Sequence, residues 1–163
     1  MKSIYEEASL YLKDCDNDSK IYYDNDKKFF TSGSKNFLLK DQIPDFFVGD
    51  INSDKITNKQ TNFYEDILFP NYDGLETFGD LLEKSSKQNH LADILDKNMG
   101  YNTSILEVGC GTGQLSLFLR RFNRMIFGID LSLPSLKLAE EFRSRNKIEN
   151  VFFSKMNIFN MQF

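Results

Sequence analysis

Apolar residues in the second half of the chain form short continuous runs that alternate with stretches of helical spacing. The runs at 104–108, 125–129 and 151–156 are rich in Ile, Val, Leu, Met and Phe and predict buried strands. The stretches 114–121 and 132–146 between them place apolar side chains every three or four positions, which predicts helices. Because strands and helices alternate over short connections, we expect a β-α-β-α-β unit with parallel strands, and the predicted fold class is α/β.

The first part of the chain follows a different pattern. Up to Asp73 it is rich in Phe, Tyr, Asn and Asp and has no clean period, so loops and hairpin ends are expected there rather than long helices. Between 74 and 99, two stretches with helical spacing predict two short helices that lead into the first strand. We therefore expect an irregular and helical N-terminal extension, 1–73, followed by a partial α/β domain with its lead-in helices, 74–163.

Composition and charge exclude several classes of protein. Of the 163 residues, 40% are hydrophobic, which is enough for an ordinary core. The net charge of −4 argues against nucleic-acid binding driven by bulk electrostatics. No apolar stretch approaches the roughly 20 residues of a membrane span, and the first ten residues lack the apolar segment of a secretion signal. A cytoplasmic protein without a nucleic-acid or membrane partner is expected.

Few residues suit metal or nucleophilic chemistry. Cys15 and Cys110 are the only cysteines, they are far apart, and His90 is the only histidine. This set is too small for a zinc site of cysteines and histidines, so no metal is expected. His90 falls near a predicted helix start and is not expected to be a catalytic base. Two further groups of cationic residues, which fall near predicted helix ends, are expected to be solvated there: Arg120, Arg121 and Arg124, and Arg143, Arg145 and Lys147.

The most informative segment is the turn after the first predicted strand. It has glycines at Gly109, Gly111 and Gly113, which permit positive φ and leave out the Cβ atoms that would block a ligand. The next helix begins at once, so its free N–H groups face the same space. Its spacing is GxGxG, and Gln114 stands where a dinucleotide-binding turn has its third glycine, which argues against a pyrophosphate ligand.

Two acidic residues narrow the choice of ligand. Glu107, just before the turn, would repel phosphates but suits an ammonium group. Asp130 ends the second strand, where a carboxylate can accept both hydroxyls of a ribose. An ammonium partner, a glycine cradle and a ribose acceptor together describe a site for S-adenosylmethionine. The plainer alternatives are a solvated strand residue at 107, a helix cap at 130 and a turn without a ligand.

The segments EVGCGTG and FGIDLS resemble the class I S-adenosylmethionine-dependent methyltransferases, especially small-molecule enzymes of the ubiquinone and menaquinone biosynthesis type, over about residues 104–163. The resemblance implies the N-terminal half of a Rossmann-like parallel sheet, S-adenosylmethionine as the cofactor and a small-molecule methyl acceptor. It names no catalytic residue, since the sulfonium is already activated. The cofactor-binding residues that it implies are Glu107, Gly109, Cys110, Gly111, Gly113, Asp130, Leu131, Met156 and Asn157.

Several of these assignments come with a specific role. The thiol of Cys110 is interpreted as a small filler rather than a nucleophile, and Leu131 would flank the adenine. The family usually has an aspartate after the third strand, which meets the adenine amino group. Here the residues are Met156 and Asn157, and the Asn157 side-chain oxygen can accept the same hydrogen bond without a charge.

The family's sheet has seven strands, whereas this sequence predicts three. We therefore expect an incomplete chain, from a split gene or an incomplete reading frame, with a weakened or absent cofactor site and no turnover on its own. Ile105, Leu106 and Val108 would then form a hydrophobic sheet edge that can pair with another chain. Alternatively, residues 1–73 fold over this edge, or a partner supplies the missing strands.

The role of the extension and two other functions also stay open. Phe63, Tyr64, Phe69 and Tyr72 either belong to a lid over the cofactor, as in the family, or pack on the sheet. The first alternative function is a non-catalytic assembly or regulatory module that uses the half-sheet as a docking edge. The second is a nicotinamide-dependent oxidoreductase fragment, against which Gln114 argues.

Overall fold

A parallel sheet at the centre of the molecule confirms the predicted α/β class. In this computed structural model, the strands β6 (Ser104–Val108), β7 (Met125–Asp130) and β8 (Val151–Lys155) pair in the order β6-β7-β8. Helices α5 (Gln114–Leu119) and α6 (Leu133–Arg145) make the two crossovers. The residues that the structure describes are 3–33, 35–48 and 70–163. None of the helices within these ranges is long and apolar enough to cross a membrane.

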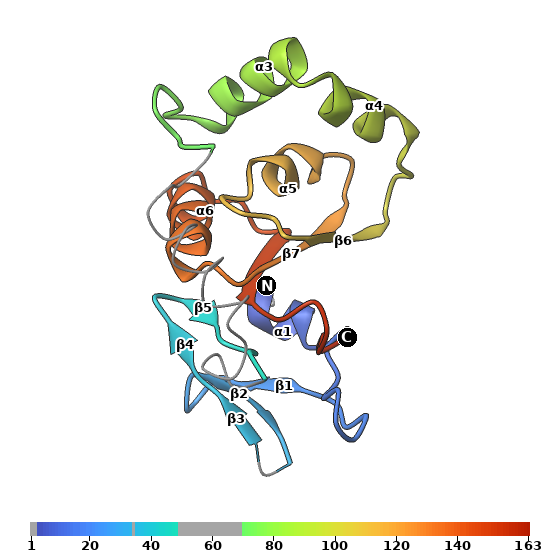
Figure 1. Ribbon diagram of the computed structural model, residues 1–163, viewed down its shortest axis with the longest axis vertical. Coiled ribbons are helices and arrows are strands. Elements are labelled where there is room, and N and C mark those ends of the chain that lie inside the picture. Colours follow the sequence, from blue (N-terminus) through green and yellow to red (C-terminus); the bar gives the residue numbers. More distant parts are fainter. Residues whose placement is uncertain (1–2, 34, 49–69) are drawn as a thin grey trace.

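Helices cover one face of this sheet (Figure 1). α5 and α6 pack against the strands, and the lead-in helices α3 (Phe78–Gln88) and α4 (His90–Asn98) pack outside α5. α3 begins with a capping box between Thr77 and Asp80, and α6 begins at Ser132, whose side chain accepts a hydrogen bond from Ser135 N–H. The apolar core on this side includes Leu81, Leu117, Phe118, Ile126, Leu136, Phe142, Val151 and Phe153.

The N-terminal extension covers the other face of the sheet. Its short elements lie below β7 and β8 in Figure 1. Met125, Phe127 and Ile129 alternate with Ile126 along β7, so they point toward the extension and form a second core with Phe30 and Phe46. The elements of the extension are α1 (Ile4–Ala8), the antiparallel strands β1 (Tyr22–Asp24), β2 (Phe29–Ser32) and β3 (Lys35–Phe37), and the hairpin of β4 (Leu39–Lys40) and β5 (Ile43–Pro44).

The two edges of the parallel sheet differ. At β8, the Phe46 N–H donates to the Lys155 oxygen at 2.9 Å, so the chain after β5 covers part of that edge. Among the described residues, β6 pairs only with β7, and the side chains of Leu106 and Val108 are 38% and 42% exposed. The described part of the extension therefore covers a face of the sheet and leaves the β6 edge open, which agrees with the expected hydrophobic edge.

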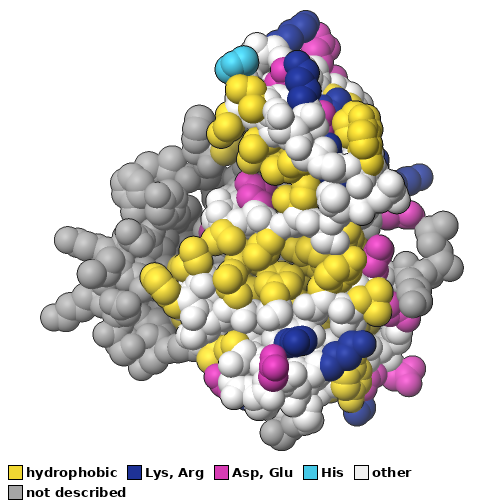
Figure 2. Space-filling model, turned by 90° about the vertical axis from the view of Figure 1, so that its right-hand side faces the viewer, with side chains coloured by type: hydrophobic (Ala, Val, Ile, Leu, Met, Phe, Trp, Pro, Cys, Tyr) yellow, Lys and Arg dark blue, Asp and Glu magenta, His cyan; other side chains and the backbone are white. Residues whose placement is uncertain are grey.

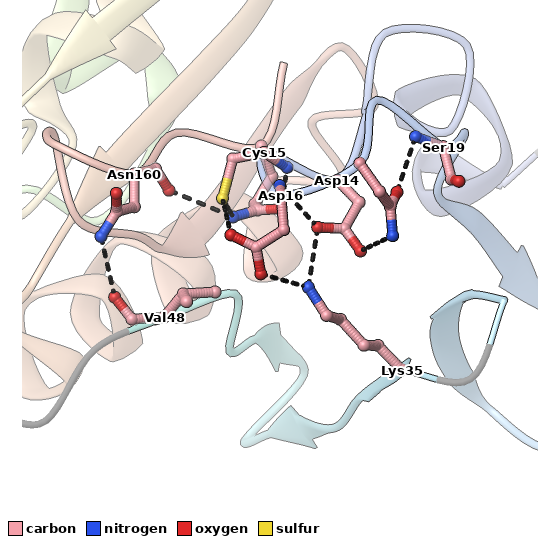
Figure 3. Close-up of polar contacts among 9 residues, drawn as sticks. Asp14, Cys15, Asp16, Ser19, Lys35, Val48 and Asn160 are labelled. Carbon is pink, nitrogen blue, oxygen red and sulfur yellow. Dashed lines mark hydrogen bonds and ion pairs between the residues drawn. The ribbon is translucent and has the colours of Figure 1, made fainter.

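Hydrogen bonds join the C-terminal residues 160–162 to the extension. Gln162 is fully buried, and its amide oxygen accepts from the Cys15 N–H at 3.1 Å. Its amide nitrogen donates to the Cys15 sulfur at 2.9 Å and to the Asn160 oxygen at 3.1 Å. Asn160 in turn donates to the Val48 oxygen at 3.3 Å (Figure 3). These bonds join residues from opposite ends of the printed sequence.

A lysine stabilises the loop that holds this segment. Figure 3 shows the Lys35 ammonium between the carboxylates of Asp14 and Asp16, at 2.9 and 2.5 Å. The Asp14 side chain is fully buried. Since a buried carboxylate needs a partner, Lys35 compensates the charge of Asp14 and ties β3 to the loop.

The expectation of solvated arginines was wrong for two of them. The Arg124 side chain is only 1% exposed, and its guanidinium lies 2.6 Å from the Asp96 carboxylate of α4. Arg143 is also largely buried and pairs with Glu140. A place near a helix end suggests a solvated cation, but Arg124 meets Asp96 of α4, and Arg143 meets Glu140, one turn earlier in α6. Arg124 also donates to the main-chain oxygens of Asp96, Met99, Gly100 and Leu119.

Candidate cofactor site

The glycine turn follows β6 and is held to the end of β7. The N–H groups of Gly109 and Cys110 donate to the Ile129 oxygen at 2.8 and 3.0 Å. As predicted, Gly109, Gly111 and Gly113 have positive φ angles of 71°, 53° and 74°. Residues with a Cβ adopt this left-handed region at a cost of about 1–2 kcal/mol. The backbone path of this turn therefore favours glycines at these positions.

Two of these glycines serve different purposes. A Cβ added at Gly109 would meet no other atom within 4 Å, so this position borders open space. A Cβ at Gly113 would lie 2.5 Å from the Phe153 ring and 2.9 Å from the Ala139 Cβ. Gly113 therefore allows α5 to start close to β8 and α6, and its expected role of admitting a ligand belongs to Gly109 instead.

Glu107 lies on the side of β6 that faces α5. Its carboxylate accepts a hydrogen bond from the Ser116 hydroxyl. Partial burial raises its pKa, and the nearby charge of Asp130 raises it further. Within the described ranges, no lysine or arginine nitrogen lies within 4.0 Å of it. A partly desolvated carboxylate without a cation suits a positively charged ligand.

Asp130 connects the glycine turn to the start of α6. One carboxylate oxygen accepts from the Gly111 N–H at 2.8 Å, and the other accepts from the Ser132 N–H at 2.8 Å. Asp130 therefore does accept a hydrogen bond at the start of α6, as the helix-cap alternative expected, but it also binds the glycine turn. Each oxygen of a carboxylate has two acceptor positions, so both retain one for a ligand hydroxyl. The bonds hold the carboxylate in place beside the turn.

The other predicted residues are placed less uniformly. Cys110 is buried, and burial raises the pKa of its thiol well above the usual value, which agrees with a small filler. Leu131 is half-buried after Asp130. The Met156 side chain packs into the core shared with the extension. The Asn157 side-chain oxygen accepts from the Phe159 N–H at 3.0 Å and keeps a second acceptor position. The structure thus brings Glu107, the turn and Asp130 together, and it directs Met156 into the core.

Pro70, Asn71 and Tyr72, which precede α3 in the chain, contact the turn or the first residue of α5. Of these three residues, only Tyr72 was singled out from the sequence. The Tyr72 hydroxyl donates to the Thr112 oxygen at 2.6 Å. Its ring stacks on Phe142 of α6, with centroids 4.5 Å apart. Tyr72 therefore packs on a helix that covers the sheet. The other aromatic residues of the expected lid, Phe63, Tyr64 and Phe69, lie outside the described residues. Because these contacts join segments about 40 positions apart, no local pattern in the sequence indicates them.

Two hollows that described residues line lie away from this turn. One, of about 340 Å³, lies between the β4–β5 hairpin and α6 and includes Gln42 and Lys137. The other, of about 210 Å³, lies near the starts of the strands and includes Ser104 and Asn150. Neither is lined by Glu107 or Asp130, so the space beside Gly109 is what supports a ligand there.

Comparisons with known proteins agree with this arrangement. Residues 100–163 match a family model described as a methyltransferase domain. The tRNA/tmRNA (uracil-C(5))-methyltransferase of Sulfurimonas denitrificans is 24% identical over 129 residues, which cover 74% of this chain and 34% of that protein. The solved structure of geranyl diphosphate C-methyltransferase from Streptomyces coelicolor A3(2) has a TM-score of 0.52 and 15% identity, over 68% of this chain and 50% of that one.

The chain thus spans about a third of the curated relative and half of the solved structure. The structural similarity supports the fold, and the family match falls on the segment that contains the sheet and the glycine turn. These findings show that residues 100–163 are similar to a methyltransferase domain, and they support the same fold for this part of the chain.

Proposed function

We propose that the glycine turn of this chain binds S-adenosylmethionine for methyl transfer. The observation that carries this proposal is the pairing of Gly109, which borders open space, with Glu107, a carboxylate without a described cation. Glu107 would hold the ammonium group of the cofactor, and Asp130 would accept the ribose hydroxyls. When bound, the cofactor supplies a methyl group on a sulfonium that is already activated for transfer.

The chain's own contribution would be binding and orientation. The turn and Asp130 are already held by main-chain hydrogen bonds, so little ordering is needed when a ligand binds. We propose no general acid or base from these residues. Since the chain spans only part of its relatives, we further propose that turnover needs additional chain.

The methyl acceptor is proposed to be a small molecule. The net charge of −4 does not favour a polyanionic substrate. One relative is named for tRNA and one solved structure holds geranyl diphosphate, so the matches themselves do not choose between these classes. An assay of labelled methyl transfer to tRNA and to a small-molecule extract would distinguish these two classes of acceptor. The assay would use the chain together with the additional chain that turnover is proposed to need.

Glu107→Gln is the first test of the cofactor site. The amide keeps the size of the side chain but removes the charge that would hold an ammonium group. Since hydrogen bonds to charged groups contribute about 1.5–3 kcal/mol, we expect S-adenosylhomocysteine to bind about 10- to 100-fold more weakly in a calorimetric titration. Glu141→Gln, which changes an exposed acid of α6, is the control and should bind like the wild type.

The ionisation of Glu107 also predicts in which direction stability and ligand affinity change with pH. Because the pKa of Glu107 is raised in the folded protein, its ionisation favours the unfolded state, and stability falls as pH rises through that pKa. The stability of Glu107→Gln should not show this fall with pH. Over the same rise in pH, the affinity for the ligand should increase in the wild type but not in Glu107→Gln. A folded wild-type protein that releases no heat with S-adenosylhomocysteine contradicts the proposed function.

The open β6 edge supports a second candidate, assembly with another copy of the chain. Figure 2 shows a band of hydrophobic side chains across the face on the right of Figure 1, at the height of the sheet. Leu106 and Val108 are exposed on this strand, whose outer edge no described residue pairs with, and unpaired apolar edges readily add a further strand. Two copies related by a two-fold axis could pair through β6.

Leu106→Asp tests this candidate. A charge in the middle of a paired edge is expected to dissolve a dimer, which sedimentation velocity would show as a shift to the monomer mass. Leu38→Asp is the matched control, because Leu38 is 62% exposed and lies after β3, away from this edge. A wild-type protein that sediments as a monomer at high concentration rules this assembly out.

A further inference from the structure

We propose that Tyr72 and Thr112 are positioning residues that hold the glycine turn in its ligand-binding shape. Residues 70–72, which we call the strap, reach the turn from outside the sequence motif. The inference rests on the proposed function, because the quantity at stake is the affinity of this turn for the cofactor. Neither side chain is proposed to touch the ligand.

The strap and the turn exchange hydrogen bonds in both directions. From the strap, the Tyr72 hydroxyl donates to the Thr112 oxygen at 2.6 Å. From the turn, the Thr112 hydroxyl donates to the Pro70 oxygen at 2.5 Å. Just after it, the Gln114 amide donates to the Asn71 oxygen at 2.6 Å. All three residues of the strap therefore bond to the turn or to the first residue of α5.

Both main partners are well anchored. Thr112 is fully buried. Burial raises the pKa of Tyr72 well above its usual value, so its hydroxyl keeps the proton that it donates. The Tyr72 ring stacks on Phe142, a buried residue of α6. The strap thus links the turn to the helix that follows Asp130, the other end of the candidate site.

The position of Thr112 explains why this matters. It lies between Gly111 and Gly113, the residues with the greatest conformational freedom in the turn. Fixing both the oxygen and the hydroxyl of Thr112 restricts the dihedral angles of its two glycine neighbours. A turn that is already ordered loses less conformational entropy when it binds a ligand, and the affinity is higher by that difference.

The test separates positioning from simple packing. Tyr72→Phe keeps the ring and its stacking and removes only the hydroxyl, whereas Thr112→Val removes the other hydroxyl with little change of shape. Both are expected to bind S-adenosylhomocysteine about 3- to 10-fold more weakly than the wild type, the loss expected for one hydrogen bond. Thr112→Ser, which restores the hydroxyl, should return the affinity to within about twofold of the wild type.

Amide hydrogen exchange of residues 109–113 provides a readout without ligand. Exchange should be faster in Tyr72→Phe and Thr112→Val, and unchanged in the control Tyr101→Phe, whose side chain is 67% exposed. Unchanged exchange and affinity, with only a lower melting temperature, would assign the strap a purely structural role. If the wild type does not bind S-adenosylhomocysteine, the proposed function fails, and exchange alone then decides whether the strap orders the turn.

Discussion

Arg124→Ala is expected to lower the free energy of unfolding by about 3–5 kcal/mol, the cost of breaking a buried ion pair. Arg124 is the largest fully buried side chain among the described residues, and it lies 2.6 Å from Asp96. Its removal leaves the main-chain oxygens of the segment after α4 without their donor. Because this segment leads directly into β6, its loosening also affects the sheet.

Arg121→Ala is the matched control for this prediction. Arg121 contacts the same Asp96 carboxylate at 2.5 Å, but its side chain is 29% exposed. Arg124 would remain to neutralise Asp96, so we expect a loss of about 1 kcal/mol or less, as for surface ion pairs. Urea unfolding followed by circular dichroism measures both. Equal losses for the two variants would mean that burial of Arg124 does not set its contribution.

Gly113→Ala is expected mainly to lower stability, whereas Gly109→Ala is expected mainly to abolish ligand binding. Gly113→Ala combines a left-handed backbone, about 1–2 kcal/mol, with overpacking against Phe153, about 1–3 kcal/mol, so we expect a stability loss of about 2–5 kcal/mol. Gly109→Ala has the backbone cost alone. Its methyl group would instead occupy the space proposed for the ligand, so it should stay folded and lose S-adenosylhomocysteine binding.

Thermal unfolding and calorimetric titration of the two variants test this distinction. Gly79→Ala in α3 is a suitable control, since its Cβ would meet only Thr77 at 3.4 Å and the helix has ordinary dihedral angles there. If Gly109→Ala binds as tightly as the wild type, the open space beside this residue does not hold the ligand. If Gly113→Ala is as stable as the wild type, Phe153 moves more easily than its packing indicates.

The sequence predicted those parts of the fold that depend on local patterns. The three strands follow from apolar runs, and the positive φ of the turn glycines follows from residue chemistry. The same local reasoning selected Glu107 and Asp130, and the structure places both beside the turn.

What could not be predicted depends on contacts between distant segments. Nothing near Arg124 in the sequence shows that Asp96 of α4 will meet it. Gly113 looks like Gly109 until the Phe153 ring is placed beside it. The pairing of Tyr72 with Thr112 likewise requires the path of the chain between them. The same holds for the extension, whose aromatic residues showed no period that would indicate which surface they cover.

The second core has a consequence for how the chain is made. Phe30 and Phe46 pack against each other and against Phe152 of the central sheet, so part of their burial comes from β8. A ribosome produces these two aromatic residues long before it produces β7 and β8. The extension is therefore synthesised before the strands that complete its burial, and until then it exposes apolar side chains of the kind that promote aggregation during folding.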